Sequence, residues 1–114
     1  MTTLAKAQLL QEQENQVTLS IQAPAELLYF QGHFQQAPVL PGVVQINWAI
    51  HYAQQYFSMP PHFAGMEAIK FQQIARPEQP LTLELSYNPD KQKLSFSYRS
   101  ATASHSSGRI LWSD

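Results

Sequence analysis

One segment of the chain has the pattern of a long helix, and it restricts the fold more than any other feature. No proline occurs between Pro41 and Pro60, and apolar residues recur at helical spacing over Gly42–Phe57. They form two adjacent stripes: Val43, Ile46, Ile50, Ala53 and Phe57 in one, and Val44, Trp48 and Tyr52 in the other. Two such stripes predict a helix that is covered on most sides. Pro41 suits the first helical position, because its φ is already helical.

Most of the remaining chain has strand patterns. Three segments alternate apolar and polar residues with a period of two: Val17–Gln22, Leu81–Tyr87 and Leu94–Tyr98. Met66–Phe71 and Gly108–Trp112 are further candidates, and Leu27–Leu40 and Arg76–Pro80 are predicted loops. One helix cannot cover both faces of a sheet, so a parallel β-α-β arrangement is disfavoured. The prediction is a single α+β domain over residues 1–114, with an antiparallel β-sheet wrapped around one long central helix.

Composition narrows the function classes. The 114 residues carry a formal net charge of -1, which gives no electrostatic case for binding nucleic acid or an anionic membrane. Cysteine is absent, so disulfides and thiolate chemistry are excluded. No segment approaches the roughly 20 apolar residues of a membrane span, and Met1–Gln11 has no signal-peptide pattern. A soluble, cytoplasmic domain is expected.

Four histidines could carry chemistry, and His33 differs from the others. It lies between Gly32 and Phe34, in the loop before the helix. Glycine allows unusual dihedrals or a close approach to a ligand, and imidazole is the usual general base near neutral pH. Spacing alone leaves a structural or surface role for His33 open. His62, after two prolines, and His105, among serines, are expected to be solvated.

The start of the helix supplies a second component. Gly42 and Val43 would present backbone N–H groups that have no intrahelical acceptor, at the positive end of the helix dipole. Such groups can polarise a carbonyl and stabilise an oxyanion. Every helix has such an end, but this one begins eight residues after a loop histidine, which favours a functional role.

These residues together resemble a known signature. The segment Tyr29–Val44, YFQGHFQQAPVLPGVV, resembles that of the β-hydroxyacyl-acyl-carrier-protein dehydratases of the FabA/FabZ type. Their pattern is Gly-His-Phe-Pro, then a proline, then a hydrophobic residue and Pro-Gly-Val, and it opens the central helix of a hotdog fold. Lys70-Phe71 with Arg76-Pro77 is similar to the strand and loop after that helix, and Gln45–Ala49 resembles the smaller, ApeI-like relatives found in aryl polyene clusters.

The resemblance implies a mechanism. The acyl chain arrives as a thioester on the phosphopantetheine arm of an acyl carrier protein, with no other cofactor and no metal. His33 would remove the α-proton, the N–H of Gly42 would hold the thioester oxygen, and the carbonyl of Val39 would orient the imidazole. An acid on the helix, from the partner subunit of a dimer, would help to expel the β-hydroxyl as water. The residues expected to contact substrate are Phe34, Val39, Val43 and His51.

The chain departs from this pattern at the acid. The family's Asp or Glu, fourteen residues after the histidine, is replaced by Asn47. An amide has no acidic proton to donate, although it can hydrogen-bond to the leaving hydroxyl. No Asp or Glu occurs from Leu27 to Met66, so a carboxylate would have to come from elsewhere, such as Glu67, or from another chain. Gln35 also replaces the proline after Gly-His-Phe.

His51 is a possible substitute for the missing acid. It follows Asn47 by four residues and therefore lies on the same helical face, with Gln54 three residues further on. An imidazolium at this position could donate the proton. Alternatively, the three side chains form a polar stripe at a dimer contact or beside buried water.

Three functions remain open on these grounds. The first is a dehydratase with His33 as base and a weakened acid at Asn47. The second is a weakened homologue that binds acyl chains or carrier protein, or that completes a heterodimeric dehydratase. The third is a hotdog acyl thioesterase, although its attacking water would also need a carboxylate or an equivalent group.

A homodimer is the expected assembly, and a heterodimer with a related dehydratase is the alternative. Carrier proteins are acidic, so a docking patch on this chain should be basic. Six cations of the C-terminal half could form it, or they could be scattered solvated charges: Lys70, Arg76, Lys91, Lys93, Arg99 and Arg109.

Overall fold

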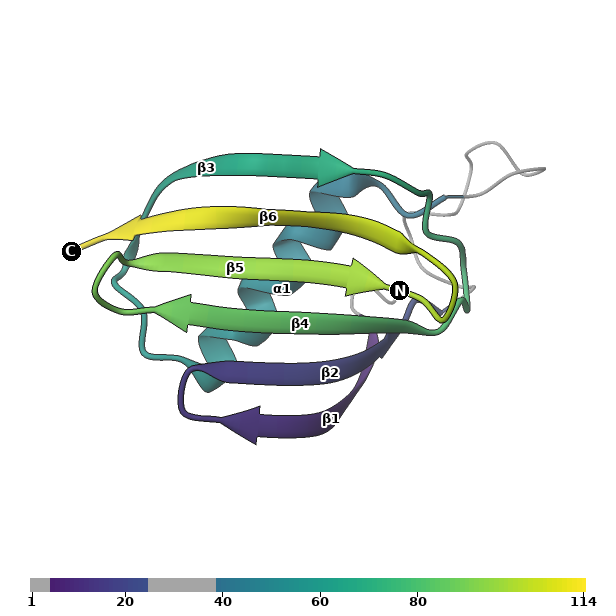
Figure 1. The fold of residues 1–114 in the computed structure, drawn as a ribbon, viewed down its shortest axis with the longest axis horizontal. Coiled ribbons are helices and arrows are strands. Elements are labelled where there is room, and N and C mark those ends of the chain that lie inside the picture. Colours follow the sequence, from purple (N-terminus) through teal and green to yellow (C-terminus); the bar gives the residue numbers. More distant parts are fainter. Residues whose placement is uncertain (1–4, 25–38) are drawn as a thin grey trace.

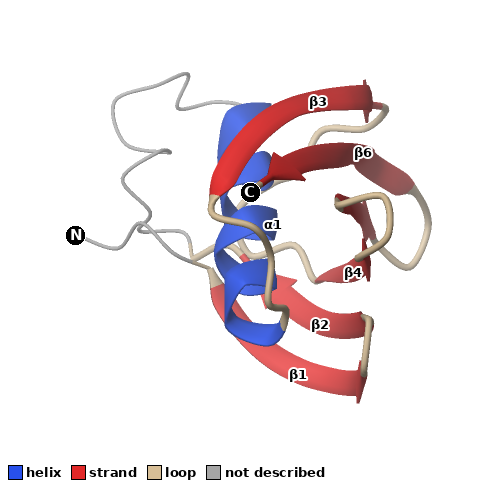
Figure 2. Ribbon diagram, turned by 90° about the vertical axis from the view of Figure 1, so that its left-hand side faces the viewer, coloured by secondary structure: helices blue, strands red, loops and turns tan. Residues whose placement is uncertain are grey.

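One curved antiparallel sheet and one helix make up the part of the chain that the computed structural model describes, residues 5–24 and 39–114. The elements are β1 (Lys6–Gln13), β2 (Gln16–Gln22), α1 (Gly42–Tyr56), β3 (His62–Phe71), β4 (Leu81–Asn88), β5 (Lys93–Arg99) and β6 (Ser104–Ser113). The six strands lie in the order β1-β2-β4-β5-β6-β3, and every neighbouring pair is antiparallel. The sheet curves around α1, which lies on its concave side (Figures 1 and 2). The predicted α+β arrangement is therefore confirmed.

The core lies between the concave face of the sheet and one side of the helix. Alternate residues of β4, Leu81, Leu83 and Leu85, are buried, as period-two patterning requires of a sheet with one covered face. Apolar side chains of α1 meet them: Val44, Trp48, Ala49, Tyr52 and Ala53. Burial of this surface is the main favourable contribution to folding.

The helix is less enclosed than its two stripes predict. The stripe of Val44, Trp48 and Tyr52 is buried as expected, but Val43 is 63% exposed and Ile46 is only half-buried. The sheet covers one side of α1 (Figure 2). The exposure of Val43 and the partial exposure of Ile46 place them away from that covered side. Within the described structure, one face of α1 therefore remains uncovered by the sheet, and it carries both apolar and polar side chains.

Strand β1 has no counterpart in the sequence prediction. It lies at one edge of the sheet, all eight of its residues are exposed, and its pairing with β2 is irregular between Leu9 and Gln11. An edge strand that buries neither face shows no alternation. Two other strands start earlier than predicted, β3 at His62 and β6 at Ser104.

The helix starts one residue later than predicted. Pro41 lies at the N-cap with an extended conformation, so the first helical residue is Gly42.

Candidate active site

The site begins at the first turn of α1. Pro41 has φ -60° and ψ 146°, and its carbonyl oxygen accepts the N–H groups of Val44 at 3.1 Å and Gln45 at 3.2 Å. In a planar trans peptide the C=O and N–H point in opposite directions. Since the Pro41 carbonyl points into the helix, the N–H of Gly42 points out of it. This N–H and that of Val43 precede the intrahelical ladder, at the positive end of the dipole.

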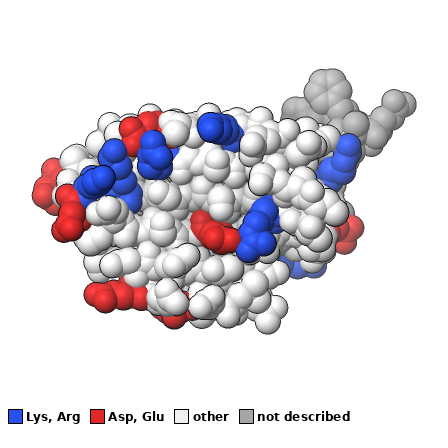
Figure 3. All heavy atoms as spheres, in the orientation of Figure 1, with Lys and Arg blue, Asp and Glu red and all other residues white. Residues whose placement is uncertain are grey.

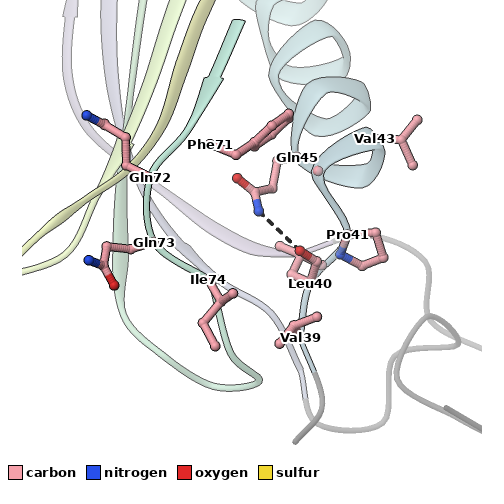
Figure 4. Close-up of a pocket in the computed structure, with 10 residues that line it drawn as sticks. Val39, Leu40, Pro41, Val43, Gln45, Phe71, Gln72, Gln73 and Ile74 are labelled. Carbon is pink, nitrogen blue, oxygen red and sulfur yellow. Dashed lines mark hydrogen bonds between the residues drawn. The ribbon is translucent and has the colours of Figure 1, made fainter. Parts of the chain in front are cut away.

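A cavity of about 510 Å³ opens at this turn. Its lining comes from the start of the helix and from the end of β3 with the following loop: Val39, Leu40, Pro41, Gly42, Val43, Gln45, Phe71, Gln72, Gln73 and Ile74 (Figure 4). A volume of this size is typical of small-molecule sites. The cavity brings together three predicted site residues, Val39, Gly42 and Val43. Asn47 and His51 do not line it.

Phe71 is a wall of the cavity that received no site role from the sequence. A methyl group at Gly42 would lie 2.6 Å from its ring, so the close approach of ring and helix requires a glycine there. A β-bulge aims the ring at the helix. Glu67 pairs with exposed Arg109, whereas Phe71 pairs with buried Ser106, and the register shifts between Glu67 and Lys70.

A buried polar network lies beneath the first turn. The amide nitrogen of Gln45 donates to the Leu40 carbonyl at 3.2 Å (Figure 4), and the hydroxyl of Ser106 donates to the amide oxygen at 2.6 Å. The hydroxyl of Tyr98 donates to the backbone carbonyl of Gln45 at 2.7 Å. Burial raises the pKa of Tyr98 well above its usual value, and nearby Tyr52 adds to this, so Tyr98 remains a neutral donor. A single glutamine inside a helical pattern gives no sequence signal of burial.

Asn47 and His51 lie further along the open face of α1. Asn47 is exposed and His51 is half-buried. Within the chain, the Nε2 of His51 lies 3.1 Å from the amide nitrogen of Gln55, one turn further along the helix. An amide nitrogen can only donate a hydrogen bond, so this ring nitrogen is the acceptor in the contact.

Glu67 is the wrong candidate for a replacement acid within this chain. Its carboxylate faces the convex side of the sheet, where it contacts Lys93 at 2.8 Å and Arg109 at 3.0 Å. The hydrogen bond from Lys93, and then that from Arg109, holds the pKa of Glu67 below its usual value. The group is therefore an ionised partner of two cations, and it lies on the other side of the sheet from the cavity.

His62 and His105 differ in their exposure to solvent. His62 is exposed, as expected, but His105 is buried at 3% exposure. The prediction for His105 was wrong because its serine neighbours belong to β6 and not to a loop. Its Nδ1 donates to the Ile74 carbonyl at 3.0 Å, and the Ser100 hydroxyl lies 2.9 Å from its Nε2. His105 thereby holds the loop that lines the cavity. His33 and Phe34 lie outside the described residues.

The six cations proposed for carrier docking do not form one continuous patch on the convex face. Figure 3 shows Lys and Arg side chains there interspersed with acidic ones. Arg99 pairs with Glu84 at 2.7 Å, and Lys93 and Arg109 share Glu67. Exposed pairs of this kind contribute little to stability, but they reduce the positive potential that a docking partner would meet.

Neither a cluster of metal ligands nor a membrane-spanning helix is found in the residues that the structure describes. No group of three His, Cys, Asp or Glu side chains within residues 5–24 and 39–114 could hold a metal ion. No helix in the same ranges is long and apolar enough to cross a membrane.

Solved structures share this architecture. A chain of "The Dehydratase Heterocomplex ApeI:P from Xenorhabdus doucetiae" superposes with a TM-score of 0.85 and 31% identity over 97% of both chains. An uncharacterized protein from Erwinia carotovora has 37% identity and a TM-score of 0.81, covering 95% of this chain and 94% of that one. The mouse thioesterase superfamily member 2 shares only the fold, with a TM-score of 0.70 at 12% identity, over 92% of this chain and 79% of that one.

Sequence relatives agree with these structures. The 3-hydroxyacyl-[acyl-carrier-protein] dehydratase FabZ of Oenococcus oeni is 30% identical over 81 residues, covering 65% of this chain and 58% of the relative. FabZ of Chloroflexus aggregans is 38% identical over 64 residues, covering 50% and 44%. The chain thus matches less than two thirds of the length of these FabZ proteins.

Fold and relatives together define the class as the FabZ-type dehydratase family with the hotdog fold, as the signature around the helix start predicts. Residues 9–109 match the family described as ApeI dehydratase. The protein belongs to the ApeI-like dehydratase family.

Proposed function

We propose that the protein removes water from a 3-hydroxyacyl thioester carried on the phosphopantetheine arm of an acyl carrier protein. The observation that supports this most directly is the cavity at the start of α1, onto which Gly42 and Val43 open. A thioester oxygen placed at the first turn would accept the outward N–H of Gly42. Such a hydrogen bond strengthens as negative charge develops on that oxygen, which makes the α-proton more acidic.

The proposed elimination uses His33 as the base. Its imidazole takes the α-proton, the electrons of that C–H bond form the α–β double bond, and the β-carbon–oxygen bond breaks. The leaving hydroxyl becomes water by taking one proton, either the one that the His33 imidazolium now holds or one from solvent, and release of its proton returns His33 to the base form. Asn47 stands at the acid position and can hydrogen-bond to the leaving oxygen without donating an acidic proton. We therefore expect a slow enzyme, since general acid catalysis contributes about 10²–10⁴-fold.

Mass spectrometry of the carrier-bound substrate tests this function. Purified protein is incubated with a 3-hydroxyacyl carrier-protein thioester, and the acyl group is examined for the loss of one water. The reverse reaction, hydration of the enoyl thioester, is followed in parallel because elimination is reversible. Turnover in neither direction, by a protein that binds the thioester, would exclude the enzymatic role.

A second candidate is a subunit that completes a heterodimeric dehydratase. Asn47 favours it, because a partner with Asp or Glu at the equivalent position would supply the missing proton. The structural relative from Xenorhabdus doucetiae is named as a heterocomplex. In such a pair, this chain would contribute His33 and Gly42. Turnover that appears only after a FabZ-type chain is added would support this role.

A thioesterase is not favoured. Hydrolysis needs an activated water, and no carboxylate belongs to the part of the cavity lining that the structure describes. The likeness to the mouse thioesterase superfamily member concerns the fold alone.

Strand β3 is the proposed dimer edge. It is an outer strand of the sheet, and it carries exposed apolar side chains, with Phe63 at 54% and Met66 at 49% exposure. An exposed apolar edge invites pairing with another chain. Such a dimer would bring a second subunit to the end of β3 that lines the cavity.

Sedimentation velocity should therefore show a dimer of the wild-type chain. We expect Met66→Lys to shift it toward monomer, since a charge on the edge strand opposes edge pairing. Leu10→Lys is the matched control: Leu10 is 55% exposed on β1, at the opposite edge of the sheet, and the dimer should persist. A wild-type chain that is monomeric and active would contradict a shared site.

A further inference from the structure

We infer that Gln45 is a positioning residue, which sets the direction of the Gly42 N–H by holding two successive carbonyls at the start of α1. The inference rests on the proposed function in one respect, namely that the thioester oxygen binds at this N–H. The positioning itself concerns only described residues and can be measured without substrate.

Burial makes Gln45 unusual. Its side chain is 3% exposed, at a helix position that faces the sheet. A leucine would fill this position without a polar group that needs a hydrogen-bond partner. Burying an amide is unfavourable unless both of its ends are hydrogen-bonded. Both ends are, to the Leu40 carbonyl and to the Ser106 hydroxyl. Each end of the buried amide therefore has a partner.

Gln45 holds the turn at two adjacent points. Its side chain donates to the carbonyl of Leu40 at 3.2 Å, and its backbone N–H donates to the carbonyl of Pro41, also at 3.2 Å. The first bond fixes the Leu40–Pro41 peptide, and the second fixes the Pro41–Gly42 peptide. Because the proline ring locks φ, only ψ of Pro41 links the two planes. Once both carbonyls are held, the direction of the Gly42 N–H is determined.

The sheet anchors this arrangement. Ser106 on β6 orients the amide of Gln45, and the Leu40 N–H donates to the Ala75 carbonyl at 2.7 Å. Leu40 is thus bonded through both its N–H and its carbonyl, and its own side chain is buried. Displacing reacting groups by about 1 Å can lower a rate by about 10²-fold. The loss of the Gln45 bond should have a comparable effect on catalysis.

The variant Gln45→Leu removes the two side-chain hydrogen bonds and fills the space with an apolar group of similar size. By NMR we expect the Gly42 amide resonance to move and the Leu40 amide to exchange with solvent about tenfold faster, as local opening becomes easier. We expect kcat to fall about 10²-fold while KM changes less than about threefold, because the lost alignment acts mainly in the transition state.

Tyr52→Phe provides the matched control. It removes a hydrogen bond from the same helix, that of the Tyr52 hydroxyl to the Ala5 carbonyl at 3.2 Å, without touching the first turn. Thermal melting compares the stability losses of the two variants. The Gly42 resonance and kcat should stay near wild type in Tyr52→Phe. Equal effects in both variants would reduce Gln45 to a structural residue and overturn the inference.

Gln45→Glu adds a pH-dependent readout. A neutral carboxyl group can still donate to Leu40 and accept from Ser106, whereas a carboxylate can only accept. Burial raises a carboxyl pKa, so the variant should resemble wild type at low pH. As pH rises through that raised pKa, the Gly42 resonance should move toward its position in Gln45→Leu. Wild type should show no such transition.

The outcomes separate this inference from the proposed function. If the folded Gln45→Leu protein keeps the Gly42 resonance and the Leu40 exchange rate of wild type, the positioning role is wrong, whatever the turnover. If both change but wild type never loses water from a 3-hydroxyacyl thioester, the positioning role stands and the proposed dehydration fails.

Discussion

His33→Ala is expected to slow dehydration of a 3-hydroxyacyl thioester by about 10²–10⁴-fold, the range that a general base usually contributes. In the proposed mechanism the Gly42 N–H facilitates removal of the α-proton, so loss of the base would leave a polarised thioester with no group to deprotonate it. The substitution removes no core side chain of the described fold. The melting temperature and the proposed dimer should therefore stay near wild type.

Hydration of an enoyl thioester, followed by absorbance or by mass spectrometry, measures this effect. His62→Ala serves as the control, because His62 is an exposed histidine of the described chain and lies outside the cavity lining. Its rate should match wild type. Undiminished turnover in His33→Ala would remove the base from the proposed mechanism.

The secondary structure could be predicted where burial is one-sided and regular. In β4 and β5 every second residue enters the core, and the period of two in the sequence follows directly. The helix was predictable from Pro41 and from apolar spacing. Strand β1 was not, because it is an exposed edge whose residues face solvent on both sides. A hydrophobic pattern arises where alternate residues contact a core, and the exposed residues of β1 make little such contact.

The backbone groups at the start of α1 could be predicted from the sequence, whereas the positions of the side chains around them could not. The free N–H groups of Gly42 and Val43 were predictable because every helix start leaves its first N–H groups without an intrahelical acceptor, and both residues line the cavity. Strict alternation places Glu67 and Phe71 on the same face of β3, whereas the bulge between them puts Glu67 outside and Phe71 against the helix. A register change of this kind leaves little trace in the residue pattern. The burial of Gln45 likewise depends on which side of α1 meets the sheet.

Asn47→Asp and Asn47→Glu address the departure from the dehydratase pattern directly. Restoring a carboxylic acid should raise the dehydration rate by about 10²-fold or more, since a general acid can contribute about 10²–10⁴-fold. Asn47 is exposed in the middle of α1, and aspartate and asparagine have similar helix propensities. The fold should therefore accept the change, so that a difference in rate reports on chemistry rather than on stability.

Gln54→Glu is the matched control for this gain. Gln54 is also exposed on the open side of α1, but it lies about two helical turns beyond Asn47. The substitution adds the same negative charge at a different position along the helix, and the dehydration rate of this variant should stay at the wild-type level. A gain in the Asn47 variants alone would show that the rest of the site is competent and that the wild-type chain lacks only the acid. No gain, in variants that dimerise and bind the thioester, would mean that a related chain must supply more than a proton donor.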